Sequence, residues 1–176
     1  RPAIDSRVKK SLAAVFVLTL TGCASLSGDG GSGPVTRVVH ERLNAQIHPI
    51  RGEEDHRAVE GRVKLLLSQA LTPDAAVQVA LLNNRGLQAA MAELGAVEAD
   101  AVQAGRLPNP GFSFARRRNG EVEWERGLHV DLLRILTLPT VHGIETRRLA
   151  QTQHLTAMTA LALAALLSTG AQAAGP

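Results

Sequence analysis

Three histidines and three acidic residues that lie near one another in the chain have the side chains that bind zinc. They are His40, His48, His56, Glu53, Glu54 and Asp55. Imidazole and carboxylate groups are zinc ligands. The histidines are eight residues apart, and Pro49 and Gly52 interrupt any helical face that these groups might have shared. We therefore interpret the segment as a solvated surface, and we expect neither a metal nor a cofactor.

A glycine-rich run, GDGGSG at residues 28–33, has the composition of a phosphate-binding loop. It lacks the Gly-Lys-Ser/Thr ending of such loops, and no convincing strand–loop–helix unit surrounds it. The chain also shows neither a catalytic triad nor a pair of acidic residues placed for acid–base chemistry. We therefore expect that the protein is not an enzyme.

The composition excludes two further classes. The 19 Lys and Arg residues against 16 Asp and Glu give a net charge of +3, which is too weak to predict a nucleic-acid partner. The single cysteine excludes a disulfide scaffold and a cysteine-based zinc cluster. Aromatic residues make up only 2% of the chain, while Ala and Leu supply most of its apolar content, so we expect long helices with narrow seams.

That single cysteine, Cys23, follows a segment with the layout of an export signal. Basic residues at 7, 9 and 10 precede a short apolar run, residues 11–20, and small residues follow. The sequence Leu20-Thr21-Gly22-Cys23 resembles the bacterial lipobox, in which cleavage leaves a lipidated cysteine as the first mature residue. We predict a signal peptide at residues 1–22 and lipidation of Cys23. The alternatives are a buried helix or strand at 11–20 and an inert buried thiol.

The two segments that follow the cysteine are expected to differ. Residues 23–34 are rich in Gly and Ser, and we predict a flexible tether between the lipidated cysteine and the folded part. Residues 35–71 are mixed and polar, and we predict one short helix in them, over residues 59–71.

The clearest predicted element is a long helix over residues 72–107. Thr72 is a good N-cap, and Pro73 suits the first helical position. Residues 83–86, Asn-Asn-Arg-Gly, predict a break or kink. Small and medium apolar residues recur every seven positions, at Ala80, Leu87, Leu94 and Ala101. This seam suits a coiled coil, and it suits one helix of a globular bundle equally well.

A β-hairpin is predicted over residues 108–139. Two prolines at its start end the preceding helix, and Asn119-Gly120 favours a type I′ turn. We predict strands over 111–118 and over 121 to about 136, the second ended by Pro139. One face of the second strand carries Val122, Trp124, Leu128, Val130 and Leu132. The other carries Glu121, Glu123, Glu125, His129 and Asp131. Such alternation suits a half-buried soluble sheet, the commoner case, or the wall of a membrane barrel.

The remaining segment, residues 140–176, is predicted to be helical. Its first part is charged, whereas residues 156–176 carry no charge. The apolar part of that run is too short for a transmembrane helix. We interpret 140–176 as the start of a further long helix that is truncated or altered at its end.

Taken in order, residues 59–155 resemble the opening of a TolC-type outer-membrane efflux protein. The sequence motifs that carry the resemblance are Leu71-Thr72, Ala75-Ala76, Ala80-Leu81-Leu82-Asn83-Asn84, Leu87, Leu94-Gly95, Ala104-Gly105, Leu107, Asn109 and Pro110. The order of helix, break, long helix, Pro-Asn-Pro, hairpin and helix is also that of the family. The lipobox resembles that of its lipoprotein members, and Ala24 in place of Asp then implies sorting to the outer membrane.

The resemblance implies a fold and a function. The fold class is mainly α with a β-hairpin, in which long coiled-coil helices continue the strands of a trimeric outer-membrane β-barrel that this chain holds only in part. The function is that of a passive export duct for small molecules or ions. The implied partners are two further copies of the chain, a periplasmic adaptor protein, an inner-membrane pump and outer-membrane lipid. A non-conducting structural lipoprotein is the alternative.

In this family reading the hairpin spans the membrane. Its turn, beside Arg116, Arg117 and Arg118, is then expected at the extracellular rim. The side chains of Val122, Trp124, Leu128 and Val130 are expected to face lipid. Those of Glu123, His129 and Asp131 are expected to face the lumen.

Overall fold

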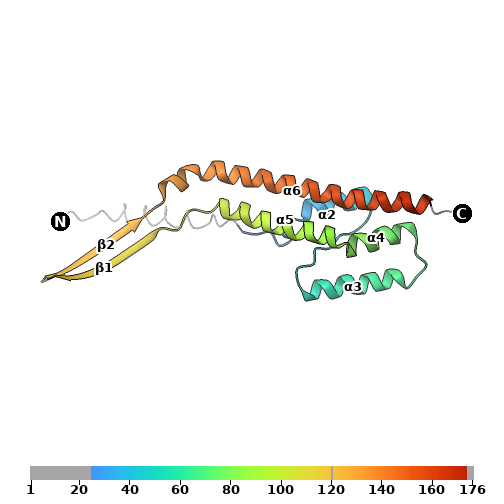
Figure 1. Ribbon diagram of the computed structural model, residues 1–176, viewed down its shortest axis with the longest axis horizontal. Coiled ribbons are helices and arrows are strands. Elements are labelled where there is room, and N and C mark those ends of the chain that lie inside the picture. The colour runs from blue at the N-terminus through green and yellow to red at the C-terminus, as the bar shows by residue number, and fades with distance from the viewer. Residues whose placement is uncertain (1–24, 120, 174–176) are drawn as a thin grey trace, which may run out of the picture.

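A computed structural model describes residues 25–119 and 121–173, which form five helices and one hairpin. The elements are α2 (Gly33–Leu43), α3 (Glu53–Leu67), α4 (Pro73–Asn83), α5 (Arg85–Ala104), β1 (Gly111–Asn119), β2 (Glu121–His129) and α6 (Leu132–Ala173). The molecule is elongated (Figure 1). Helices α5 and α6 run side by side, the hairpin projects from one end of this pair, and the shorter helices gather toward the other end. The expectation of a mainly helical chain with a β-hairpin is confirmed.

The core lies where α2, α4 and α5 meet α6. Leu81, Leu87 and Leu94 are at most 1% exposed. They belong to one apolar cluster with Val35 and Val39 of α2 and with small residues of α6. The seven-residue seam therefore marks the buried face of α5, as predicted from its periodicity.

The predicted break in the long helix is confirmed, and it is a capped joint. Helix α4 begins after Thr72, whose Oγ1 accepts a hydrogen bond from the Ala75 N–H at 3.2 Å. Helix α5 begins after Asn84, whose Oδ1 accepts one from the Leu87 N–H at 2.9 Å. Each side-chain cap satisfies a backbone donor that the first turn of a helix leaves without a partner.

The prediction of a flexible tether is wrong for residues 27–34. Gly33 and Pro34 already belong to α2, and Ser32 is only 3% exposed. Pro34 suits the first turn of a helix, which the glycine-rich composition around it conceals. Helix α2 then ends at Leu43 and is capped by Asn44, which has a left-handed backbone with a φ of 48°.

The short helix predicted over residues 59–71 is shifted in the structure. Helix α3 begins at Glu53 and ends at Leu67. Its first turn holds all three acidic residues of the 53–55 run. Negative charge at this position is favoured by the helix dipole, so these acidic residues, which we interpreted only as solvated surface, also start a helix.

The second strand is shorter than predicted. It ends at His129, and α6 begins at Leu132, so Leu132 is not a strand residue. The Oδ1 atom of Asp131 accepts a hydrogen bond from the Arg134 N–H at 2.9 Å, which caps the new helix. Pro139 lies inside α6 and ends no strand. A single helix therefore spans the segment that we divided at residue 139.

One face of the uncharged segment, residues 156–173, belongs to the core. Ala157, Ala160 and Ala164 are buried against the other helices. Their small side chains let α6 approach its neighbours closely. Within residues 25–119 and 121–173, no helix combines the length and apolar character that crossing a membrane requires.

Candidate functional site

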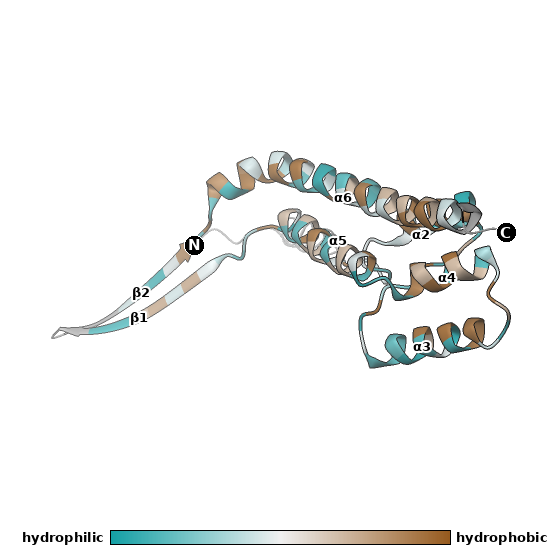
Figure 2. Cartoon of the chain, turned by 45° about the vertical axis from the view of Figure 1, so that its right-hand side comes forward, coloured by the Kyte–Doolittle hydropathy of each residue, from teal (hydrophilic) through white to brown (hydrophobic). Residues whose placement is uncertain are grey.

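The hairpin is a regular antiparallel pair of strands that extends away from the helices. Phe112 lies opposite Leu128, Phe114 opposite Arg126, and Arg116 opposite Trp124. Residues directly opposite one another point to the same side of a sheet, and neighbours along a strand point to opposite sides. The register therefore fixes two faces, and Figure 2 shows the strands changing from hydrophobic near the helices to hydrophilic toward the tip.

One face of the hairpin exposes large apolar side chains. We call Phe112, Phe114, Trp124 and Leu128 the apolar hairpin face. Phe112 is 80% exposed, and Trp124, the most covered of the four, is still 50% exposed. The rings of Phe114 and Trp124 lie 5.2 Å apart, and the Arg116 guanidinium lies 5.3 Å from the Trp124 ring. Phe114 contacts Trp124 across the strands and Phe112 lies opposite Leu128, but the four side chains are not covered by the rest of the chain that the structure describes.

The opposite face is polar. Arg117 and Glu125 form an ion pair at 3.4 Å, and both are exposed. His129 lies opposite Gly111 on this same face. The two faces therefore differ in chemistry as predicted, although two arginines interrupt the apolar face: Arg126, opposite Phe114, and Arg116, opposite Trp124.

A second uncovered apolar surface runs along α6. Its members, which we call the outer stripe, are Val141, Ile144, Leu155, Met158 and Leu166. They lie on the side of α6 opposite the buried Ala157, Ala160 and Ala164, and the exposed polar residues Arg148 and Gln151 divide them into two groups. Helix α6 therefore has two apolar seams, one filled by this chain and one exposed.

The residues first considered as zinc ligands do not form a site. The His48 Nε2 atom lies 3.3 Å from Asp55 Oδ1, but no group of three or more possible ligands comes together among the described residues. The Asp55 carboxylate also accepts a hydrogen bond from the Arg51 backbone N–H at 3.0 Å. That N–H, and next the His48 ring, hold the pKa of Asp55 below its ordinary value.

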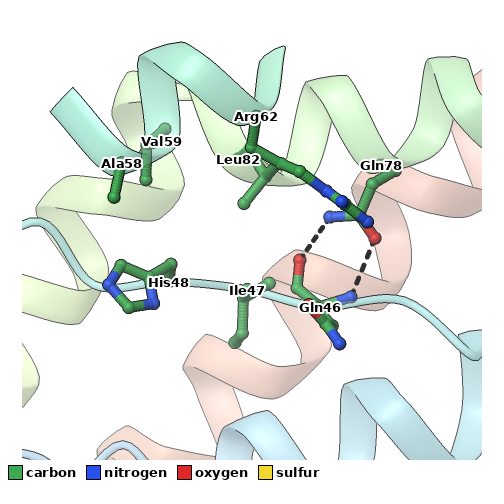
Figure 3. Close-up of a pocket in the computed structure, with 8 residues that line it drawn as sticks. All are labelled: Gln46, Ile47, His48, Ala58, Val59, Arg62, Gln78 and Leu82. Atoms are coloured by element: carbon green, nitrogen blue, oxygen red, sulfur yellow. Dashed lines mark hydrogen bonds between the residues drawn. The ribbon is translucent and has the colours of Figure 1, made fainter. Parts of the chain in front are cut away.

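Near His48, a cavity of about 410 Å³ opens between α3, α4 and the segment that follows α2 (Figure 3). The Gln78 side chain on its wall pairs with the Gln46 backbone, since the Gln46 N–H donates to Gln78 Oε1 at 2.9 Å and Gln78 Nε2 donates to the Gln46 carbonyl at 2.7 Å. The remaining wall combines Ile47, Ala58, Val59 and Leu82 with the polar side chains of His48 and Arg62. The Gln78 amide is paired with the Gln46 backbone and the His48 ring lies against Asp55, so few polar groups of this wall are left to bind a substrate.

The predicted site residues fall into three groups. Cys23 and the signal peptide lie outside the described residues, as do Gly120 of the turn and the side chains of Arg118, Val122 and Glu123. Trp124 and Leu128 share the apolar face, and His129 lies on the other. Val130 follows the end of the strand, and Asp131 caps α6, so the expectation that both belong to the strand is wrong.

Sequence reasoning missed the role of Glu98. This residue lies four positions after Leu94 in the seam of α5, and it is only 6% exposed. Its carboxylate accepts a hydrogen bond from the Ser27 N–H at 2.9 Å. A charged residue in an otherwise apolar seam was the available signal.

A comparison with known protein families, curated proteins and solved structures finds no match to this chain.

Proposed function

We propose that the chain contributes one helix–hairpin–helix unit to a TolC-type outer-membrane channel. In this proposal three copies assemble, their hairpins contribute strands to one barrel, and their long helices form a periplasmic duct. An adaptor protein and an inner-membrane pump bind the far end, and small molecules or ions pass through without any catalytic step. The observation that carries the proposal is the uncovered apolar face of a hairpin that projects from the end of a helix pair.

The length of the strands supports a membrane location for the hairpin. Both β1 and β2 contain nine residues. A strand that crosses a bilayer at a tilt needs about 9–11 residues. The hairpin has two free edges, and only neighbouring strands from other copies can satisfy their backbone groups inside a membrane. Assembly of several chains is thus part of the proposal.

The outer stripe of α6 supports the helical part of the duct. Ile144 and Leu155 are more than half exposed and lie on one side of a helix whose other side is already packed. A helix with two apolar seams fits an arrangement in which it contacts a neighbour on each side. Coiled-coil packing of that kind is what a tube of helices requires.

The same stripe also supports the alternative, a lipoprotein that binds a helical partner and conducts nothing. The two functions differ in what the polar hairpin face does. In a channel it lines water, whereas in an interaction module neither face needs to contact lipid. Conductance of the purified, reconstituted protein across a planar bilayer separates them, since only the channel passes current.

Thiol accessibility along β2 tests the membrane location directly. Leu128→Cys and His129→Cys are adjacent positions on opposite faces, so each is the matched control for the other. In cells that export the protein, a water-soluble thiol reagent is expected to modify the variant at 129 and to spare the variant at 128. Equal modification of both would contradict a lipid-facing hairpin.

A further inference from the structure

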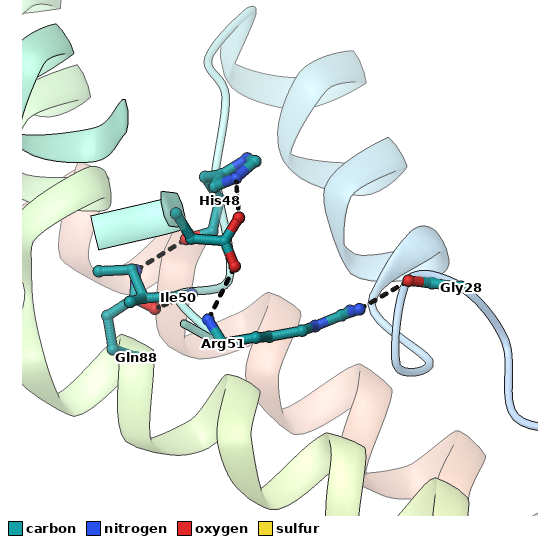
Figure 4. A network of polar contacts seen from close by, with 6 residues as sticks. Gly28, His48, Ile50, Arg51 and Gln88 are labelled. Carbon is teal, nitrogen blue, oxygen red and sulfur yellow. Dashed lines mark hydrogen bonds and ion pairs between the residues drawn. The ribbon is translucent and has the colours of Figure 1, made fainter. Parts of the chain in front are cut away.

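Residues 27–32, which we call the strap, lie against the α5–α6 pair. The Ser27 N–H donates to Glu98 Oε1 of α5 at 2.9 Å. Gln153 of α6 donates through Nε2 to the Gly31 carbonyl, also at 2.9 Å. One short segment is thereby held on both long helices. A third contact joins the strap to the loop before α3, where Arg51 Nη1 donates to the Gly28 carbonyl at 2.6 Å (Figure 4).

The strap has its own tight fold. Gly30 and Gly31 have φ angles of 59° and 72°, a left-handed conformation that glycine adopts without a steric penalty. The Ser27 hydroxyl donates to Asp29 Oδ1 at 2.5 Å, and the Gly31 N–H donates to the Ser27 hydroxyl at 2.8 Å. A Cβ atom at Gly30 would lie 2.8 Å from the end of the flexible Arg51 side chain, so the left-handed backbone, rather than this contact, is what favours glycine there.

The carboxylate that receives the strap is unusual for its position. Glu98 is a charged residue in the apolar seam of α5, and its Oε2 atom is buried without a hydrogen-bond partner among the described residues. Burying a carboxylate costs free energy unless hydrogen bonds compensate it. An apolar side chain would fill the same seam without that cost. The Glu98 carboxylate does accept a hydrogen bond from the Ser27 N–H, and we infer that holding the strap is its role.

We propose that the strap is a docking device that fixes the point at which the anchored amino terminus leaves the helix pair. This inference rests on the lipidation of Cys23 that the lipobox predicts. Four residue steps separate Cys23 from Ser27, which is about 14 Å of fully extended chain. A free tether over residues 23–34 would reach about 40 Å. Docking at Glu98 thus limits the distance from this point of the α5–α6 pair to the membrane surface to about 14 Å.

The test is amide hydrogen exchange at Ser27, resolved by residue, in the full chain. Glu98→Ala removes the acceptor, and Glu93→Ala, an exposed position on the same helix, is the matched control. We expect Glu98→Ala to speed exchange at Ser27 by about tenfold or more. Glu98→Gln keeps an acceptor oxygen and should retain the protection, and the control should match the unaltered chain.

Two results would overturn the docking. One is a Ser27 amide that exchanges in the unaltered chain as fast as an unprotected amide. The other is an unchanged rate in a Glu98→Ala variant that keeps its helical circular dichroism. If that variant loses its helices, Gln153→Ala removes the contact on α6 instead and should speed exchange in the same way. Because exchange does not depend on acylation, the mass of the mature amino terminus at Cys23 tests the anchor separately.

Discussion

The helical body and the hairpin contain similar apolar residues, but the body buries them and the hairpin exposes them. In the body, Leu87 and Leu94 are covered by α6 and by small residues packed around them. In the hairpin, Phe112 and Leu128 pair across the strands and remain mostly exposed. The body therefore obtains its stability within one chain, whereas the hairpin depends on surroundings that one chain does not supply.

The largest loss of stability is expected from a cavity in the core of the helices. Leu94 is fully buried, and Leu94→Ala should lower the free energy of unfolding by about 2–5 kcal/mol. The matched variant Leu128→Ala removes the same atoms from the hairpin, where the side chain is 62% exposed, and should change it by less than about 0.5 kcal/mol. Urea titrations followed by helical circular dichroism measure both. Similar losses would mean that the hairpin belongs to the same cooperative unit.

A charge on the apolar hairpin face reverses that ranking if the property measured is membrane insertion. Leu128→Lys should disfavour insertion by about 2–4 kcal/mol if the residue lies near the middle of the bilayer. His129→Lys places the same charge on the polar face and should be tolerated. The fraction of exported protein that resists extraction from the outer membrane reports the difference. Equal behaviour of the two variants would show that the faces do not differ in environment.

A smaller effect is expected at the joint between α4 and α5. Asn84→Ala removes the side chain that accepts the Leu87 N–H and should cost about 1 kcal/mol. Asp131→Ala removes the corresponding cap of α6 beside the hairpin. Because the first turns of α6 are exposed, its loss should fray that end with little change in the unfolding midpoint. Hydrogen exchange near residues 132–136 separates local fraying from global destabilisation.

The smallest change in stability is expected at low pH, where Asp55 becomes protonated. The Arg51 N–H and the His48 ring hold the pKa of Asp55 below 3.8, its ordinary value. A depressed pKa gives stability that is complete above the ordinary value and is lost as the pH falls through the folded-state pKa. Asp55→Asn should therefore flatten a slight decline in unfolding midpoint below about pH 4. The hairpin variant Glu125→Gln is the control, and an unchanged decline in Asp55→Asn would contradict the assignment.

Local signals predicted the elements that local chemistry determines. Thr72 and Asn84 are side-chain caps, and their positions gave the start of α4 and the joint before α5. The seven-residue spacing of Leu87 and Leu94 gave the buried face of α5. The alternation in β2 gave the two hairpin faces. In each case the residue type and the residues within one or two turns decide the outcome.

The remaining features depend on distant partners. Residues 27–32 have the composition of a linker, yet residues far along the chain hold them in place: Arg51, Glu98 and Gln153. Val130 and Asp131 continue the alternation of β2, yet Asp131 turns the chain into α6. The residues after His129 fit both the alternation of a strand and the start of a helix. The packing of α6 along α5 decides in favour of the helix.

Pro139 has a mechanical consequence for the hairpin. It has no N–H, so the Ile135 carbonyl, four residues earlier in α6, lacks its usual intrahelical donor. The missing bond lies within two turns of the hairpin, in a helix that continues for 42 residues, about 63 Å. Bending is least costly where that bond is absent. A force that acts on the hairpin is thus expected to bend α6 near Pro139. The packed part of the helix, from Leu149 to Ala164, is expected to bend less.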